Sequence, residues 1–294
     1  MISSDTPTGP DKSGAELNAQ RFAMLEDIAK ELAGEVVFPV DFNATMRLRK
    51  TLQNPDLPTP KIAAAVETEP LVAARLLQLA NSVLYRRDDT PVRNLSTAIT
   101  RIGLKVVKTT ALAIAMNQLL RAKELVVFSD LATSLWRHSV HSAVAARQLV
   151  RREECPIDPE DAFLAGLVHD LGASYMLYRA AHYPELRARP DTVRHLILQW
   201  HESIGGSLLH ALGFAEDVVN AIADHDQLRT SPPKGLRNLN DVVYVANALA
   251  GAHFEWSALG VPAPTLVDLG LEEHYGEMRP AISAEAQTLL TALT

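Results

Sequence analysis

The residues of this sequence best suited to chemistry are an adjacent histidine and aspartate, His169 and Asp170, at the end of an apolar segment. We predict a helix over 158–170, because an Asp-Pro pair starts the segment and Gly172 follows it. Asp170 would then face the negative end of the helix dipole, which costs roughly 0.3–1 kcal/mol if nothing offsets it. Either a metal ion or a basic side chain should therefore lie opposite this carboxylate.

Further histidines can join this pair. All ten histidines lie after residue 137, at positions 138, 141, 169, 182, 195, 201, 210, 225, 253 and 274. Helical periodicity turns His138, His201 and His225 toward the packed sides of their helices and His141 away from its packed side. A single inward histidine is more often a hydrogen-bonded core residue than a ligand. Several of them beside a carboxylate can hold a divalent ion that activates water for phosphoester hydrolysis.

Helical periodicity also predicts the elements that must position these side chains. From Ala15 onward nearly every long segment has a helical period, and only 35–40 resembles a strand, for which we expect a linker. The predicted fold class is therefore all-α. Caps, prolines and glycines place helices at 41–52, from Thr59-Pro60, from Pro70, from Asn94 to Gly103, and at 104–124, 131–152, 158–170, 191–212, 216–226, 239–252 and 284–293.

Composition limits the class of protein. The 294 residues are 47% hydrophobic and carry a formal net charge of −7, which gives no general electrostatic reason to bind nucleic acid or an anionic membrane. The single cysteine, Cys155, excludes an internal disulfide framework and favours a reducing compartment. The polar N-terminus lacks the apolar core of a signal peptide, and no apolar run is long enough to cross a membrane. We expect a soluble, cytoplasmic protein.

Two groups of motifs resemble a known family. The segments 136–139 (WRHS) and 162–172 (AFLAGLVHDLG) resemble the HD superfamily of metal-dependent phosphohydrolases. Upstream, Phe38-Pro39, the segment 74–82 (ARLLQLANS) and the turn at Gly103 resemble the HDOD family, the HD-related output domain of bacterial signalling proteins. The resemblance covers residues 38–252.

The HDOD resemblance implies a multi-helix HD-like bundle with an N-terminal helical half packed on it, and a non-enzymatic regulatory or scaffolding role. In catalytic HD proteins the last metal ligand is the Asp of an Ala-Asp dipeptide, whereas this chain has Asn247 there. A neutral amide is a poorer ligand for a hard cation than a carboxylate. The resemblance therefore implies no catalytic residue, no required cofactor, and a vestigial metal site made of His138, His169 and Asp170, with His201, His225 and Asn247 nearby.

The related HD-GYP phosphodiesterases have extra ligand positions, which His201 and His225 resemble. The paired histidine of that family corresponds here to Asp224-His225, and its Gly-Tyr-Pro signature is not apparent where 231–235 (SPPKG) stands. These departures disfavour HD-GYP activity but leave metal binding open. Without a metal, we expect Asp170 to accept hydrogen bonds from His138 or from a basic side chain.

We expect four regions: a disordered tail over 1–15, an N-terminal helical half over 16–130, an HD-like core over 131–252 and a C-terminal helical extension over 253–294. The resemblance implies a stand-alone regulatory module of bacterial signal transduction. Its partner would be a signalling protein, a nucleotide second messenger or the enzyme that metabolises one, with no membrane involved. The alternative is a phosphohydrolase that acts on nucleotides or cyclic dinucleotides with a divalent metal such as Fe, Mn or Mg.

Nucleic-acid binding is a third hypothesis, because basic residues surround a helix–Gly103–helix element that resembles a helix-turn-helix. These residues are Arg86, Arg87, Arg93, Arg101, Lys105 and Lys108. Asp88 and Asp89 dilute their charge, and the whole chain is acidic. We therefore do not expect nucleic acid as a partner.

Overall fold

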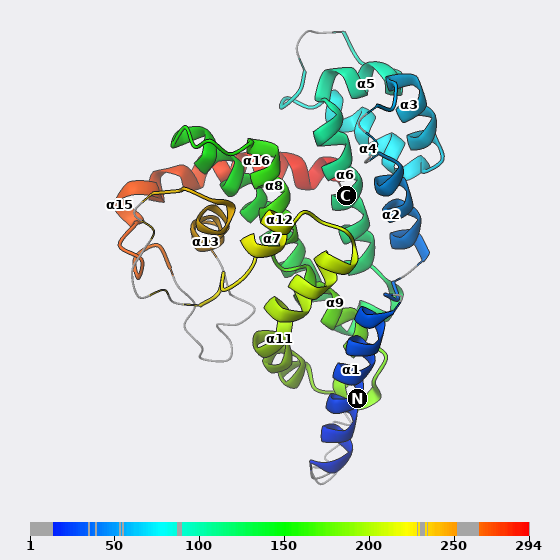
Figure 1. The fold of residues 1–294 in the computed structure, drawn as a ribbon, viewed down its shortest axis with the longest axis vertical. Coiled ribbons are helices and arrows are strands. Elements are labelled where there is room, and N and C mark those ends of the chain that lie inside the picture. Colours follow the sequence, from blue (N-terminus) through cyan, green and yellow to red (C-terminus); the bar gives the residue numbers. More distant parts are fainter. Residues whose placement is uncertain are drawn as a thin grey trace, which may run out of the picture.

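The computed structural model describes residues 14–34, 36–38, 40–52, 54, 56–86, 90–227, 229, 233, 235–251 and 265–293. Within these ranges every regular element is a helix, which confirms the all-α prediction (Figure 1). The elements are α1 (Ala15–Ala33), α2 (Val40–Leu52), α3 (Thr59–Glu67), α4 (Pro70–Ala80), α5 (Leu95–Ile102), α6 (Leu104–Leu120), η1 (Lys123–Phe128), α7 (Ser129–Arg152), α8 (Pro159–Val168), α9 (Leu171–Ala180), α10 (Pro184–Arg187), α11 (Pro190–Ala211), α12 (Glu216–Ala221), α13 (Leu239–Leu249), α15 (Glu272–Tyr275), η2 (Gly276–Met278) and α16 (Arg279–Leu293).

Most predicted helix starts are confirmed, because they rest on local capping chemistry. Asn94 caps α5 through its side-chain oxygen, which accepts a hydrogen bond from the Thr97 N–H at 2.8 Å. Asp158 caps α8 in the same way, and prolines occupy the first turns of α3, α4 and α11. None of the described helices has both the length and the apolar character needed to cross a membrane.

The prediction of one helix over 158–170 is wrong at its C-terminal end. α8 ends at Val168 and α9 begins at Leu171, so Gly172 lies inside a helix instead of after one. Asp170 is the N-cap residue of α9, where the positive end of that helix dipole offsets the negative end of α8. The dipole argument alone therefore no longer requires a cation beside Asp170.

Three other predicted boundaries differ from the structure by four or five residues. The helix expected over 104–124 ends at Leu120 and is followed by the separate turn η1. The helix expected over 216–226 ends at Ala221, and the chain then makes a turn in which Asp224 has a φ of 56°. The terminal helix starts at Arg279, five residues before the predicted start.

Gly166 and Gly172 lie on either side of the His–Asp pair and allow two close helix contacts. A Cβ atom added to Gly172 would lie 2.1 Å from the carbonyl oxygen of His201, because α9 and α11 touch backbone to backbone. A Cβ atom on Gly166 would lie 2.7 Å from the carbonyl oxygen of Ser142 in α7. Neither place has room for a side chain, so these two contacts fix the His–Asp pair between α7 and α11.

The buried helix α6 connects the two predicted halves. Most of its residues from Val106 to Leu120 are buried, and α2, α4, α5, α7, α8, α9 and α16 pack against it (Figure 1). α16 packs on α4, α6 and α7, so the C-terminal part contacts both halves. One hydrophobic core runs through all of them. The four region boundaries remain predictions, and residues 1–13 and 252–264 lie outside the described residues.

A pair of glycine substitutions tests the close approach of α9 and α11. We expect Gly172→Ala to lower the free energy of unfolding by about 3 kcal/mol or more, because the new methyl group meets immobile backbone atoms. Gly206→Ala on the same α11 is the matched control, since nothing lies within 4 Å of an added Cβ there. It should raise the free energy of unfolding by roughly 0.5–1 kcal/mol. Urea unfolding of both variants measures the difference; equal effects would contradict the contact.

Candidate metal centre

Six of the predicted site residues come together in one buried cluster. His138 projects from α7, His169 and Asp170 form the junction of α8 and α9, His201 lies on α11, His225 in the turn after α12, and Asn247 on α13. Each of the six is at most 4% exposed. The helices that carry them meet near the middle of the molecule, where α7, α8, α12 and α13 pack on one another (Figure 1).

Asp226 is a seventh member of the cluster that the sequence analysis missed. Its Oδ2 atom lies 3.3 Å from His201 Nε2, and its side chain is 10% exposed. The sequence does contain a signal for it, since His225-Asp226 is a second His–Asp dipeptide like His169-Asp170. The pairing of Asp224 with His225 is not the relevant one, because Asp224 is exposed.

The first half of the cluster gathers around His138. His138 Nε2 lies 3.1 Å from His169 Nε2 and 2.9 Å from Asn247 Oδ1. Asp170 Oδ2 lies 3.3 Å from His169 Nε2 and 3.7 Å from His138 Nε2. The ligand atoms of these two histidines and the carboxylate all lie within 4.8 Å of one another, which is close enough for one ion to contact all three.

The second half gathers around the other oxygen of Asp170. Asp170 Oδ1 lies 3.3 Å from His225 Nε2 and 3.7 Å from His201 Nε2, and the two histidine atoms are 3.3 Å apart. These three residues form a second group whose ligand atoms lie within 4.8 Å of one another. Asp170 therefore belongs to both groups, one carboxylate oxygen to each.

Backbone contacts fix how three of the imidazoles face the cluster. The Nδ1 atoms of His169, His201 and His225 lie 2.7–2.8 Å from the carbonyl oxygens of Gly166, Ile197 and Ile222. A carbonyl only accepts, so each Nδ1 must carry a hydrogen, and each neutral ring then presents the lone pair of Nε2 inward. This is the arrangement of metal-bound histidines, whose second nitrogen donates to a backbone carbonyl or carboxylate.

Facing lone pairs about 3 Å apart repel unless a cation lies between them. Either protons on Nε2 or a metal ion can supply that charge, and Asp170 and Asp226 supply the counter-charge. Imidazole and carboxylate groups together suit Fe, Zn and Mn, so the residues fit one or two divalent ions. The donor set is thus chemically complete for binding a metal, although Asn247 contributes an amide.

Asn247 holds its orientation through its own amide group. Its Nδ2 atom donates to the backbone carbonyl of His225 at 3.1 Å and to Asp226 Oδ1 at 2.9 Å, so its Oδ1 must face His138. Asn247 therefore stands where the resemblance placed it, and it links α13 to the turn that carries His225. A carboxylate at this place would set negative oxygens against Asp226.

Charges within the cluster shift the pKa values of Asp170 and His225. Burial alone would raise the pKa of the Asp170 carboxyl, but His169 and His225 outweigh burial and hold that pKa well below its ordinary value. Burial lowers the pKa of His225, but Asp226 and Asp170 outweigh it and raise the pKa to about 10. Asp170 was expected to accept from His138 or from a basic side chain; its nearest partners are His169 and His225 at 3.3 Å, and His138 lies at 3.7 Å.

The cluster meets the surface at His138. This residue lines a cavity of about 360 Å³ together with Ser134, Arg137, His141 and Gly251. His141 is partly exposed, as the helical period predicts.

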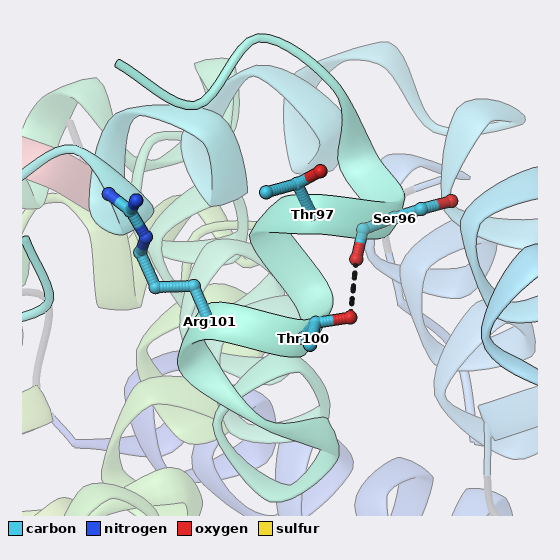
Figure 2. Close-up of a pocket in the computed structure, with 4 residues that line it drawn as sticks. All are labelled: Ser96, Thr97, Thr100 and Arg101. Atoms are coloured by element: carbon cyan, nitrogen blue, oxygen red, sulfur yellow. Dashed lines mark hydrogen bonds between the residues drawn. The ribbon is translucent and has the colours of Figure 1, made fainter. Parts of the chain in front are cut away.

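A cavity of similar volume lies elsewhere, on α5. Figure 2 shows this cavity of about 380 Å³, with the hydroxyl groups of Ser96, Thr97 and Thr100 and the side chain of Arg101. It offers hydroxyls and one guanidinium but neither a histidine nor a carboxylate, so it lacks the ligands of a histidine-based metal site. Of these two places, only the buried cluster has the ligands of a histidine-based metal site.

The cluster makes the stability of the metal-free protein depend on pH. His225 has a folded pKa of about 10 against an ordinary 6.5, so its contribution is complete below pH 6.5 and is lost as pH rises toward 10. Asp170 acts in the opposite direction, and its contribution is lost as pH falls below 3.8. We expect the free energy of unfolding to fall by up to roughly 5 kcal/mol between pH 6.5 and 10.

Urea unfolding of chelator-treated protein at several pH values measures this dependence. His225→Gln should remove most of the alkaline loss, whereas His141→Gln should leave it unchanged. Metal binding needs unprotonated Nε2 atoms, so added Mn²⁺ should restore stability at alkaline pH. If the free energy of unfolding fell equally at alkaline pH in the wild type and in His225→Gln, the raised pKa of His225 would be contradicted.

Comparisons with known proteins identify the family and the fold of the chain. A family model described as HDOD domain matches residues 38–228. A protein of Treponema pallidum (strain Nichols), named only "Uncharacterized protein", is 23% identical over 199 residues, which are 64% of this chain and 37% of that protein. The chain therefore spans little more than a third of the length of this relative.

Three solved structures share the fold. A "Putative metal-dependent phosphohydrolase" from Shewanella amazonensis SB2B has a TM-score of 0.65 and 24% identity, with 94% of this chain and 100% of that chain covered. An HDOD domain protein with unknown function from Geobacter sulfurreducens has a TM-score of 0.57 and 18% identity, with 92% and 99% covered. A "Putative signal transduction protein" from Marinobacter aquaeolei VT8 has a TM-score of 0.52 and 17% identity, with 92% and 66% covered.

These likenesses confirm the predicted HD-like helical bundle, in which the helices of the HDOD match carry the histidine cluster. The family model covers most of the chain and includes His138, His169, Asp170, His201 and His225. The chain belongs to the HDOD domain family.

Proposed function

We propose that the chain is a regulatory module of bacterial signal transduction, which acts by binding a signalling protein or a small ligand. The closure of the histidine cluster is the observation that carries this proposal. Its six predicted members are at most 4% exposed, so a phosphoester and its attacking water have little access to the ligand atoms. A hydrolase keeps an open coordination position that substrate can reach.

We also propose that the cluster binds one or two divalent ions with a structural role. His138, His169 and Asp170 would hold one ion, and Asp170, His201 and His225 a second. The supporting observation is the inward-facing Nε2 atoms, between which either protons or a metal ion must supply positive charge. The ion would join α7, α9 and α11 with the turn after α12. The expectation that no cofactor is required remains a prediction, and the donor set favours the alternative.

Metal-dependent phosphoester hydrolysis is the second candidate, and Asp226 is the observation that favours it. The carboxylate of Asp226 lies 2.9 Å from the amide nitrogen of Asn247. It therefore supplies, next to Asn247, the negative charge that an aspartate at position 247 would have carried. When bound, the ion would polarise a phosphoryl oxygen and lower the pKa of a bound water. His138 would face the substrate, because it lines the cavity of about 360 Å³.

The absence of nucleic-acid binding remains a prediction, which the packing of α6 supports. A recognition helix must expose one face to the major groove, whereas α6 is covered by helices on nearly all sides. Lys105 at its start is also paired, since its Nζ lies 2.7 Å from Asp158 and 3.2 Å from Asp161.

Metal content tests the structural role. Protein produced with added Mn and Fe should retain a stoichiometric amount of one of these metals after gel filtration. Inductively coupled plasma mass spectrometry measures the metal content. Asp170→Asn and His201→Ala should each lose the metal, and removing the metal should lower the melting temperature of the wild type. His182→Ala is the matched control, because His182 contacts a backbone carbonyl in the same way but lies outside the cluster. Metal-free wild type after supplementation would refute the proposed ion.

Hydrolysis assays separate the two candidates. We expect the metal-loaded wild type to hydrolyse neither bis(p-nitrophenyl) phosphate nor a cyclic dinucleotide above the rate of the Asp170→Asn variant. The closed cluster denies substrate the open position that hydrolysis needs. Turnover that scales with protein, stops with chelator and disappears in Asp170→Asn would instead establish the phosphohydrolase.

A further inference from the structure

Arg49 is a buried cation for which the structure provides no acidic partner. It lies in the last turn of α2 and is 9% exposed. Its guanidinium stacks over the ring of Phe214 at 3.8 Å from the ring centroid. Among the described residues no carboxylate lies within salt-bridge distance of Arg49. The negative end of the α2 dipole offsets part of the charge, but a buried guanidinium ordinarily also has a carboxylate or a phosphate beside it.

Other cations surround Arg49. Lys108 lies close enough that burial first, and then the charges of Arg49 and Lys105, lower its pKa. Burial also lowers the pKa of Arg49 to about 10. Lys105 is already paired with Asp158 and Asp161, so it is not the source of the excess charge. The charge of Arg49 thus acts against that of Lys108 in a cavity that Glu160 and Asp161 also line.

Arg49 lies where two cavities adjoin. The smaller cavity, about 180 Å³, is lined by Lys105, Lys108 and Thr109 of α6 and by Glu160, Asp161 and Leu164 of α8. The larger cavity, about 570 Å³, lies between α2 and the end of α11, and Arg49 lines both. The larger cavity combines cations with apolar surface, and its lining includes Phe38, Met46, Arg47, Lys50 and Leu212.

The charge of this cleft is opposite to that of the whole protein. Five cationic and two acidic side chains line the two cavities, whereas the chain as a whole has a net charge of −7. Both acids are already engaged, Glu160 by Arg147 and Asp161 by Lys105. The remaining positive charge has room for an anion directly against Arg49.

We propose that this cleft binds a small phosphorylated molecule, with the phosphoryl group on Arg49 and Lys108 and the remainder in the larger cavity. A dianion suits several unpaired cations better than a single carboxylate does, and a guanidinium matches two phosphoryl oxygens at once. The apolar lining of the larger cavity favours a ligand with a flat ring, as in a nucleotide. A nucleic-acid backbone would not reach a side chain as buried as Arg49. The site does not depend on whether the histidine cluster holds a metal.

Thermal unfolding with inorganic phosphate and a nucleoside 5′-monophosphate tests the proposal, at constant ionic strength set with chloride. We expect the melting temperature of the wild type to rise and saturate with phosphate, and to do so at lower concentration with the monophosphate. The unphosphorylated nucleoside should have no effect. Arg49→Met should weaken phosphate binding by about 30-fold or more, since the charge that pairs with it is lost.

Two readouts separate a binding role from a structural one. Arg49→Met should unfold at the same or a higher temperature than the wild type without ligand, because an unpaired buried charge is removed. Lys61→Gln on α3 is the matched control, an exposed cation that lines neither cavity, and it should bind phosphate like the wild type. Lys108→Gln gives a second test if Arg49→Met does not fold. No phosphate-specific shift in the wild type, or equal shifts in all variants, would overturn the proposal.

Discussion

The buried carboxylate of Asp170, shared between two pairs of imidazoles, is the interaction on which the centre of this molecule depends. Each of its oxygens faces one pair of Nε2 atoms, at 3.3–3.7 Å. A buried carboxylate is costly unless it is paired with positive charge, so the histidines must carry protons or a metal. The positions of four helices and one turn are thereby tied to the charge state of a single group. Removing the carboxylate would leave the charged imidazoles unpaired.

Asp170 lies at the junction of two helices. α8 ends and α9 begins at the His–Asp pair, and Gly166 and Gly172 allow α7 and α11 to approach on either side. Away from the cluster, α6 provides the shared core of both halves, and α16 packs against both. Main-chain contacts therefore set the spacing of the helices on either side of the cluster.

Local chemistry made much of this predictable from the sequence. Prolines and Asn94 set helix starts that the structure confirms, and helical periodicity turned His138 inward and His141 outward. The start of α9 was not predictable in this way, because the apolar run continues across the break and a glycine there resembles a helix end. Asp226 was missed because a continuous helix would place it about 100° around the axis from His225. The turn at Asp224, with its positive φ, brings both side chains to the same side.

The two glycine contacts also have a mechanical consequence. Because α7 and α11 each touch the α8–α9 segment through backbone atoms, neither helix can shift without carrying the other with it. Trp200 on α11 is 45% exposed and directly precedes the buried His201, so this helix joins the outer surface of the molecule to the histidine cluster.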